Sequence, residues 1–426
     1  MKTLNTYLII LAMILFAGCS KDFLELNPKT QVLESDFYNT EADMMEALIA
    51  AYDVLQWGGF GGYTQFEMLS DILSDDAHAG GGDANDQPQI QVLDNFTMTP
   101  SMNPEGLWGK YYSGINRTNI VIEKLPQSEA SETFKTRADA EARFLRVYYH
   151  YMLWRLYGNI PVIDHLLTPD EYDYPQSTPQ EAYDFMINEL DAYVIGNLPE
   201  TVSGMEIGRV TNGAALALKA KIVLFHNDET MMAEIASELK AVIDGGTYSL
   251  EDDLGYVFSN EGEFCNESVF EINHSEASNW GDWGWLSGGE GNIQVIMIGI
   301  RDYSGPEYSA GWGFSTVTPD LVDQYDAADL RKAATIIDVD ELQGTYKEGY
   351  QHTGYFSKKY APIDENTNSA NPMTNYNNNI RVIRYSDVLL MASEAIIRSG
   401  GNLTDAQLYY DMVRERAFGD DTNNKN

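Results

Sequence analysis

The stretch AEARFLRVYYHYMLWRLYGNIPVI, residues 140–163, decides the fold. Its large apolar and aromatic residues recur every three or four positions, as they do on one face of an α-helix. Gly158 and Pro161 follow the last of them, and both residue types end helices. We therefore expect a helix from about Ala138 to Tyr157. Its interior residues should fill a core and carry no chemistry: Phe144, Tyr148, His150, Tyr151, Trp154 and Tyr157.

Seven further segments share this helical periodicity. Thr178-Pro179-Gln180-Glu181 combines a capping box with a proline at the first helical position, which is a strong signal for a helix start. Thr40 resembles a second N-cap, and Gly400 and Gly401 end a later helix. Four of the predicted helices cover residues 41–56, 104–125, 385–398 and 405–417. Of the other three, one begins after Thr178, one follows Thr211 and ends at Phe225, and one follows Thr230 and stops at the glycines at 245–246. On the helix at 41–56, we expect one buried face that consists of Met45, Leu48, Ile49, Tyr52 and Leu55.

The helices follow one another in pairs, which predicts a solenoid-like scaffold, although no repeat has a regular period. Strand signals are short and fall at 268–272 and 294–298. Three long stretches, 57–103, 273–320 and 340–380, are rich in Gly, Asn, Asp and aromatic residues and are too long for simple connections. The sequence thus predicts one mostly helical domain with long irregular loops, and such loops usually carry binding sites.

Three charged residues near the carboxyl end are expected to hold elements together. Arg384 and Asp387 stand at the start of the helix predicted at 385–398, and Glu394 lies further along it. We expect them to form a buried polar network with a structural role.

The amino terminus has the layout of an export signal. Residues 8–17 are apolar, Lys2 precedes them, and Ala17 and Gly18 stand directly before Cys19. The apolar run is about half the length of a membrane-spanning helix. We interpret residues 1–18 as a signal peptide and Cys19 as a lipidated first residue, which leaves 19–426 as the mature domain. An ordinary signal peptide with an incidental cysteine is the alternative.

The charge of the chain excludes several partners. Removal of residues 1–18 leaves 26 Lys and Arg against 65 Asp and Glu, a net charge of −39. Such a surface repels nucleic acid and anionic lipid, so the membrane contact would be the lipid on Cys19. Cys265 is the second of only two cysteines, so no disulfide within the chain is expected once Cys19 is acylated.

The strongest binding motif is NWGDWGWLSGGEG, residues 279–291. It places Trp280, Trp283 and Trp285 among glycines, whereas a buried strand would not interleave indoles with glycine. Indole faces suit the apolar faces of sugar rings, and nearby Asp and Asn accept hydrogen bonds from hydroxyls. A hydrophobic plug under the loop is the alternative. Trp312 in SAGWGFSTVTP, and Trp57 and Tyr63 in LQWGGFGGY, are weaker candidates of the same kind.

An acidic loop, residues 70–89, adds Asp75, Asp76 and His78 as candidate ligands for glycan hydroxyls. Calcium would suit such oxygen ligands, but Pro88 occupies the position where an EF-hand needs glycine. A solvated acidic loop is the alternative. We expect no bound metal or cofactor. The sequence contains no G-x-S-x-G or H-E-x-x-H motif, so we predict a binding protein and no enzyme.

Four stretches together resemble the SusD/RagB family of outer-membrane nutrient-binding lipoproteins of Bacteroidetes: CSKDFLELNPKT at 19–30, AEARFLRVYYHYMLWRLYGNIPVI at 140–163, GRVTNGAALALKAKIVLF at 208–225 and RVIRYSDVLLMASEAI at 381–396. The resemblance implies a helical domain with tetratricopeptide-like helix pairs and an irregular, glycan-binding face. It also implies a partner, a TonB-dependent transporter of the SusC type, at the outer membrane. The family usually continues beyond the segment matched by LYYDMVRERAFGDD, so a shortened carboxyl end is expected. A peptide-binding scaffold and a surface glycoside hydrolase are the alternatives.

Overall fold

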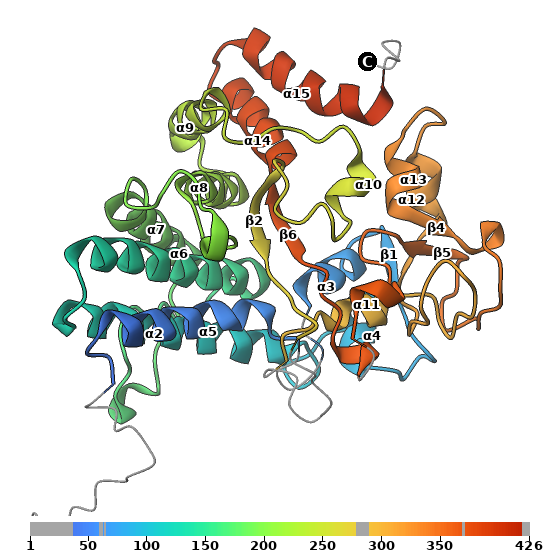
Figure 1. Ribbon diagram of the computed structural model, residues 1–426, viewed down its shortest axis with the longest axis horizontal. Coiled ribbons are helices and arrows are strands. Elements are labelled where there is room, and N and C mark those ends of the chain that lie inside the picture. The colour runs from blue at the N-terminus through green and yellow to red at the C-terminus, as the bar shows by residue number, and fades with distance from the viewer. Residues whose placement is uncertain (1–36, 59–62, 64, 278–288, 369–370, 420–426) are drawn as a thin grey trace, which may run out of the picture.

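The computed structural model describes residues 37–58, 63, 65–277, 289–368 and 371–419. Helices dominate these ranges (Figure 1). The longer helices are α2 (Glu41–Asp53), α5 (Glu105–Lys124), α6 (Glu132–Tyr157), α7 (Pro179–Glu189), α8 (Asn212–His226), α9 (Met232–Asp244), α14 (Tyr385–Arg398) and α15 (Leu403–Phe418). The shorter ones are α3 (Phe66–Ile72), α4 (Pro88–Asp94), α10 (Leu254–Val257), α11 (Ile293–Ile298), α12 (Pro319–Gln324) and α13 (Arg331–Thr335).

Strands are short and occur in antiparallel pairs. Among the described residues there are three two-stranded sheets. They join β1 (Ala77–Gly80) to β3 (Phe314–Val317), β2 (Ser268–Ile272) to β6 (Ile380–Arg384), and β4 (Ile336–Asp338) to β5 (Tyr355–Ser357). The prediction of a mostly helical fold is confirmed, and β2 has the bounds that the sequence predicted.

The long helices form one half of the molecule and the short elements form the other. In Figure 1, α2, α5, α6 and α7 lie in layers, and α8, α9, α14 and α15 continue the stack toward the carboxyl end. The β1–β3 and β4–β5 pairs, with α3, α4, α11, α12 and α13, form the opposite side. We refer to these parts as the helical half and the irregular half. No helix within the described ranges has both the length and the apolarity to cross a bilayer.

Helix α6 runs through the centre of the helical half and explains why the helices pack closely. Ser131 caps its amino end and Gly158, at φ 72°, ends it, so the helix begins six residues before the predicted Ala138. Tyr149 lies against Gly114 of α5, where an added Cβ would approach the ring to 2.4 Å. The Tyr149 hydroxyl also donates to the Ala51 carbonyl at 2.6 Å, which ties α2 to the same crossing.

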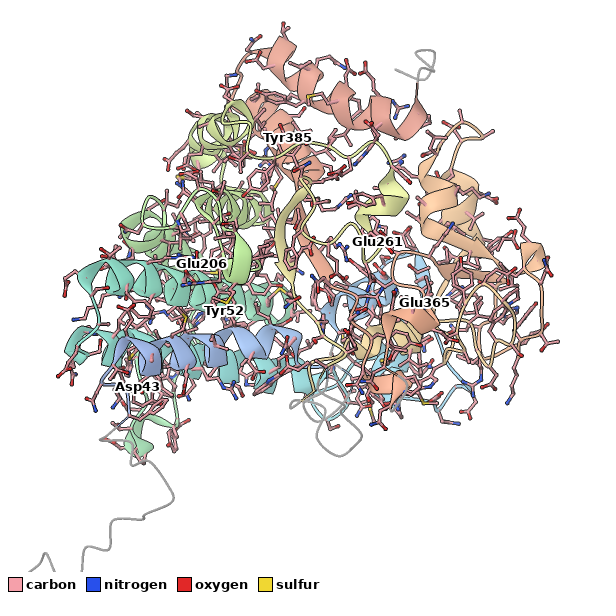
Figure 2. All side chains as sticks on the ribbon, in the orientation of Figure 1. Asp43, Tyr52, Glu206, Glu261, Glu365 and Tyr385 are labelled. Atoms are coloured by element: carbon pink, nitrogen blue, oxygen red, sulfur yellow. The ribbon has the colours of Figure 1, made fainter. Side chains whose placement is uncertain are left out.

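Buried carboxylates lock the helical half together. Glu141 of α6 is fully buried and receives Arg137 Nε at 2.8 Å and Arg209 Nη2 at 2.7 Å. The Tyr52 hydroxyl donates to it at 2.8 Å. Arg209 Nη1 also donates to Glu206 Oε1 at 2.9 Å, and Figure 2 labels Tyr52 and Glu206 in this part of the molecule. Because every charge in it has a partner, the group supports helix packing and leaves no orphaned charge.

Two local predictions were wrong. Residues 294–298 were expected to form a strand but lie in helix α11, whose first turn is capped by Asn292 accepting from Gln294 N at 3.0 Å. A short apolar run does not by itself distinguish strand from buried helix. Glu394 was expected in a buried network with Arg384 and Asp387. It is exposed and pairs with Arg398 at 2.8 Å, whereas Arg384 lies 3.3 Å from buried Glu267.

Candidate functional site

Tyr63 and Trp312 come together on the irregular half, although 249 positions separate them in the sequence. Their ring centroids lie 5.6 Å apart at 68°, an edge-to-face contact. Trp312 is half-buried, and its amide donates to the Ile296 carbonyl of α11 at 2.8 Å. Helix α11 therefore holds one side of this aromatic pair.

A glycine turn at residues 80–82 lies beside the aromatic pair. Gly80 and Gly81 have φ values of 68° and 91°, which favour glycine. Two backbone hydrogen bonds of Gly81 hold the turn. Gly81 N donates to the Gly313 carbonyl at 2.8 Å, and the Gly81 carbonyl accepts from Tyr350 N at 2.9 Å. This pairing brings the acidic loop after β1 next to the segment that carries Trp312.

Asp86 and Arg301 supply charge at the same place. Asp86 Oδ2 accepts from Gly82 N at 2.7 Å, and Arg301 Nη1 donates to the Trp312 carbonyl at 2.9 Å. Burial, with the charge of Asp86, raises the pKa of Tyr63, so its hydroxyl remains a donor at neutral pH. We call Tyr63, Trp312, Asp86 and Arg301 the aromatic cluster. Asp86 was part of the acidic loop that the sequence singled out, whereas Arg301 was missed because a lone arginine after an apolar run carries no signal.

The other loop candidates lie close by but are not part of the cluster. Asp75 and Asp76 are exposed at the end of α3, and their carbonyls accept from Thr318, each at 2.9 Å. His78 lies in β1, opposite Thr316, with Nδ1 3.7 Å from Asp94 Oδ1. No described contact joins these three side chains to Tyr63 or Trp312.

Trp57 is placed differently from Trp312. Only 7% of it is exposed, its Nε1 donates to Asp53 Oδ2 at 2.9 Å, and the Arg117 guanidinium lies 4.8 Å above its ring. Its indole thus fills the junction between α2 and α5. This placement favours a packing role for Trp57 over ligand contact.

Trp280, Trp283 and Trp285 lie outside the described residues. The described residues on either side of them are fixed, because Ser275 N donates to the Glu290 carbonyl at 2.9 Å and Asn292 N to the Tyr376 carbonyl at 2.7 Å. Glu290 also accepts a hydrogen bond from Gln56. Glu290, near the carboxyl end of the tryptophan-rich stretch, therefore lies beside Gln56, seven residues before Tyr63.

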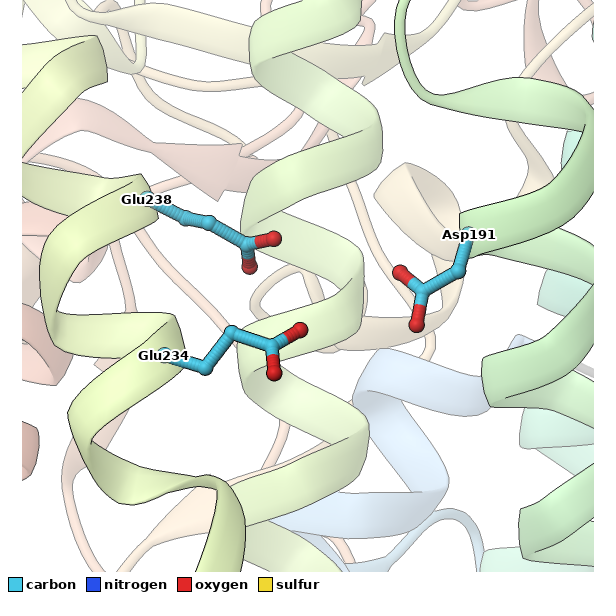
Figure 3. A group of neighbouring side chains, drawn as sticks. All are labelled: Asp191, Glu234 and Glu238. Carbon is cyan, nitrogen blue, oxygen red and sulfur yellow. The ribbon is translucent and has the colours of Figure 1, made fainter.

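A separate group of carboxylates has the spacing of a metal site but holds a lysine. Figure 3 shows Asp191, Glu234 and Glu238 turned toward one point between their helices. Lys219 Nζ lies at 2.8, 2.5 and 2.8 Å from their oxygens and is nearly fully buried. Burial disfavours its charge, but the three hydrogen bonds outweigh that cost and raise the pKa of Lys219. The ammonium group thus takes the place that a cation would need.

Two protein-family profiles match the chain, one in its amino-terminal half and one near its carboxyl end. A family profile described as "Starch-binding associating with outer membrane" matches residues 22–224, and the SusD family profile matches residues 339–426. A SusD-like protein of Bacteroides ovatus is 27% identical over 95% of this chain and 74% of its own length.

Solved structures resemble the whole described fold. Surface glycan-binding protein A from Bacteroides fluxus is 32% identical, with a TM-score of 0.84, over 89% of this chain and 82% of that one. A laminarin-binding SusD-like protein is 34% identical, with a TM-score of 0.82, over 89% and 85%. Surface glycan-binding protein A from Bacteroides thetaiotaomicron, solved with laminarihexaose, is 31% identical with a TM-score of 0.81, over 89% and 83%.

Proposed function

The chain belongs to the SusD/RagB family, and from this membership we propose that it binds glycans at the cell surface and passes them to a TonB-dependent transporter of the SusC type. Its relatives of known structure are named as glycan-binding proteins, and the expectation of a non-catalytic protein agrees with that family. A binding role is therefore retained, and a hydrolase role is not.

Laminarin is the ligand class that we propose. The observation that carries this proposal is the similarity to a laminarin-binding protein and to a protein solved with laminarihexaose, at 34% and 31% identity over more than four fifths of each. Proteins that share a fold at this sequence identity can still bind different ligands. A test of the proposal must therefore include other glucans.

The aromatic cluster supplies suitable contacts for a glucan. The Trp312 indole and the Tyr63 ring offer apolar faces to sugar rings. Asp86 accepts hydrogen bonds from hydroxyl groups and Arg301 donates them, so the two side chains fix the orientation of the sugar. We propose that Trp280, Trp283 and Trp285 extend this surface, because the chain that follows them leads through Asn292 into α11, whose Ile296 carbonyl accepts from Trp312 N at 2.8 Å.

The attachment to the membrane is proposed from the sequence. The Ala17-Gly18-Cys19 junction and the association of the family with the outer membrane both support a lipid on Cys19. With the lipid as anchor, the acidic domain would remain at the surface without electrostatic attraction to lipid head groups.

Calorimetric titration of the domain from Ser20 with laminarihexaose, maltohexaose and cellohexaose tests the ligand. We expect laminarihexaose to bind at least about tenfold more tightly than the other two. Trp312→Ala and the double change Trp283→Ala with Trp285→Ala should each weaken binding by about tenfold or more, as the loss of a buried aromatic anchor does. Tyr172→Ala, which removes a 71% exposed ring from the helical half, is the control and should change nothing.

The melting temperature of each variant separates binding from packing. A ligand platform predicts that affinity falls while the melting temperature of the double tryptophan variant hardly changes. A hydrophobic plug predicts a loss of about 3–5 kcal/mol in the free energy of unfolding with affinity intact. Equal affinity for all three hexasaccharides would contradict the laminarin proposal.

A further inference from the structure

A polar cavity of about 300 Å³ lies between the helical half and the irregular half. Its walls come from α3, α6 and α8, from α11, and from β5 and β6 with the residues that follow β5. None of the described residues that the sequence predicted to bind glycan lines it. The residues on which the argument depends are Glu67, Asp71, Arg155, Lys221, Gln294 and Lys359. We call this space the junction cavity.

Three cations line the junction cavity without a carboxylate partner. The ammonium groups of Lys221 and Lys359 form no hydrogen bond or ion pair with any other described residue, and that of Lys359 lies 4.7 Å from the centre of the Phe258 ring. Arg155 stacks on Phe66 at 4.0 Å and donates only weakly to the Tyr151 hydroxyl, at 3.4 Å. Its buried Nε has no acceptor among the described residues. In a chain with 65 acidic and 27 basic residues, three unpaired cations around one cavity are unexpected.

The other two cations at the cavity wall each have a carboxylate within 4.0 Å. Arg381 lies 3.6 Å from Glu271 and donates to the Asn379 carbonyl at 2.7 Å, and Arg384 lies 3.3 Å from Glu267. The unpaired cations are therefore not a general property of this region.

Three carboxylates, those of Glu67, Asp71 and Asp387, also line the cavity, but they do not cancel the charge of its five cations. Burial raises the pKa of Asp71 to about 6, even though Lys359 acts against the rise, and burial also raises the pKa of Glu67. None of the three carboxylates forms an ion pair with Arg155, Lys221 or Lys359 within 4.0 Å among the described residues. The lining as a whole holds five basic and three acidic side chains, which implies polar contents and an excess of positive charge.

The buried side-chain amide of Gln294 sets a second requirement for any molecule that occupies the cavity. Gln294 is 3% exposed and lines the junction cavity, and its Oε1 has no donor among the described residues. An occupant that satisfies Gln294 must donate a hydrogen bond, whereas one that satisfies the lysines must carry negative charge. A sulfate ion carries charge but has no proton to donate, so it meets only the requirement for charge, whereas a neutral sugar meets only the requirement for a donor.

Aromatic rings complete the walls. Tyr148, Tyr151 and Tyr360 line the cavity. Phe225 lies one helical turn after Lys221 on α8, is 52% exposed, and has its ring 6.1 Å from that of Tyr151. Apolar ring faces beside polar groups are typical of saccharide sites.

We propose that the junction cavity is a second binding site, distinct from the aromatic cluster, for a monosaccharide that carries a carboxylate, the class of the uronic acids. Its carboxylate binds Lys221, Lys359 and Arg155, and one of its hydroxyls donates to Gln294 Oε1. The volume lies at the lower end of the range for ligand pockets and therefore favours a single sugar ring over an oligosaccharide.

Titration calorimetry with D-glucuronate and D-glucose tests the proposal on the domain from Ser20. Glucuronate is expected to bind at least tenfold more tightly than glucose. Lys221→Met and Lys359→Met should each weaken glucuronate binding by about tenfold or more, since each removes a charge-assisted contact. Lys347→Met is the matched control, because the Lys347 side chain is 65% exposed and is not part of the cavity wall.

Two further measurements, of the folding of Lys221→Met and of its affinity for laminarihexaose, separate a loss of glucuronate binding from a loss of structure. Lys221 is partly exposed on a helix surface, so Lys221→Met should fold even if Lys359→Met does not. Laminarihexaose binding by Lys221→Met should equal that of the wild type, and glucuronate should not displace laminarihexaose. The proposal is overturned if glucuronate does not bind, if glucose binds equally well, or if Lys221→Met binds glucuronate unchanged. None of these results would bear on the laminarin proposal.

Discussion

At the scale of single residues, His150 shows how a polar side chain is accommodated in the centre of α6. Its Nδ1 lies 2.8 Å from the Arg146 carbonyl, to which it donates, and its Nε2 accepts from Ile163 N at 3.2 Å. Both ring nitrogens are thus used by the neutral form. Burial lowers the pKa of His150 to about 3, so the imidazole stays neutral in the folded protein.

Acid should therefore destabilise the fold through His150. The folded-state pKa lies below the unfolded value of about 6.5, so this stability is present above that pH and is lost as the pH falls. Between about pH 6.5 and about pH 5 the loss should be roughly 1–2 kcal/mol. Chemical unfolding at several pH values measures it, and in His150→Gln this component should disappear.

His165 provides a control of opposite sign. It is largely exposed, and its hydrogen bond to Asp164, followed by that to Glu171, raises its pKa. Its stabilisation is present at low pH and is lost as the pH rises through the folded-state pKa, so His165→Gln should lose stability mainly on the acid side. The same trend in both variants would contradict the assignment of His150 as a buried neutral group.

Single residues also show where prediction from sequence ends. Trp57 and Trp312 both stand next to glycine, yet Trp57 fills a helix junction and Trp312 meets Tyr63. The difference arises from Asp53 and Arg117, which bind Trp57, and from the pairing of β1 with β3, which brings Trp312 to the glycine turn. Only the hydrogen bond from Trp57 to Asp53 is local in sequence, whereas Arg117 and the partner strand β3 are distant.

At the scale of elements, caps and periodicity predicted the long helices well. Thr178 and Glu181 form the capping box of α7, and Thr211 caps α8 as expected. The buried face of α2 was predicted less well, since Ile49 is 58% exposed while Met44 is fully buried. Helix-packing angles decide which side of an apolar stripe is covered, and these depend on partners distant in sequence.

The ammonium group of Lys219 connects α8 to α9 and to the turn after α7, because it forms ion pairs with carboxylates on both. In Lys219→Met, three carboxylates lose their shared cation, and we expect a loss of about 1–3 kcal/mol in the free energy of unfolding, reduced by the partial exposure of the acids. Millimolar Ca²⁺ should raise the melting temperature of this variant and not that of the wild type, because the vacated space has oxygen ligands on three sides.

The control for this change is Lys240→Met. Lys240 forms an ion pair with Asp244 at 3.3 Å in which both side chains are substantially exposed. Its removal should lower the free energy of unfolding much less than the removal of Lys219 does, and it should produce no response to Ca²⁺. A calcium response of the wild type would show that Lys219 does not hold the position.

At the scale of the whole molecule, attachment and charge act together. The net charge of −38 keeps the chain away from anionic surfaces, so the proposed anchor must supply all the membrane affinity. Cys19→Ala should therefore move the protein from the membrane fraction to the soluble fraction, or leave the precursor unprocessed. Fractionation with immunoblotting measures this, with Cys265→Ala as the control that should remain at the membrane. Unchanged membrane attachment of Cys19→Ala would refute the lipid anchor.

Two of the strand pairs, β1–β3 and β2–β6, also constrain how the chain acquires its structure. Ser268 pairs with Arg384, and Ala77 pairs with Val317, so each sheet closes a loop of more than a hundred residues. Helix α6, by contrast, packs on α5, which directly precedes it in the chain. Local contacts form early during folding, whereas distant pairings form late because loop closure costs entropy. The helical half can therefore assemble first, and the aromatic cluster is completed only when the β1–β3 pair forms.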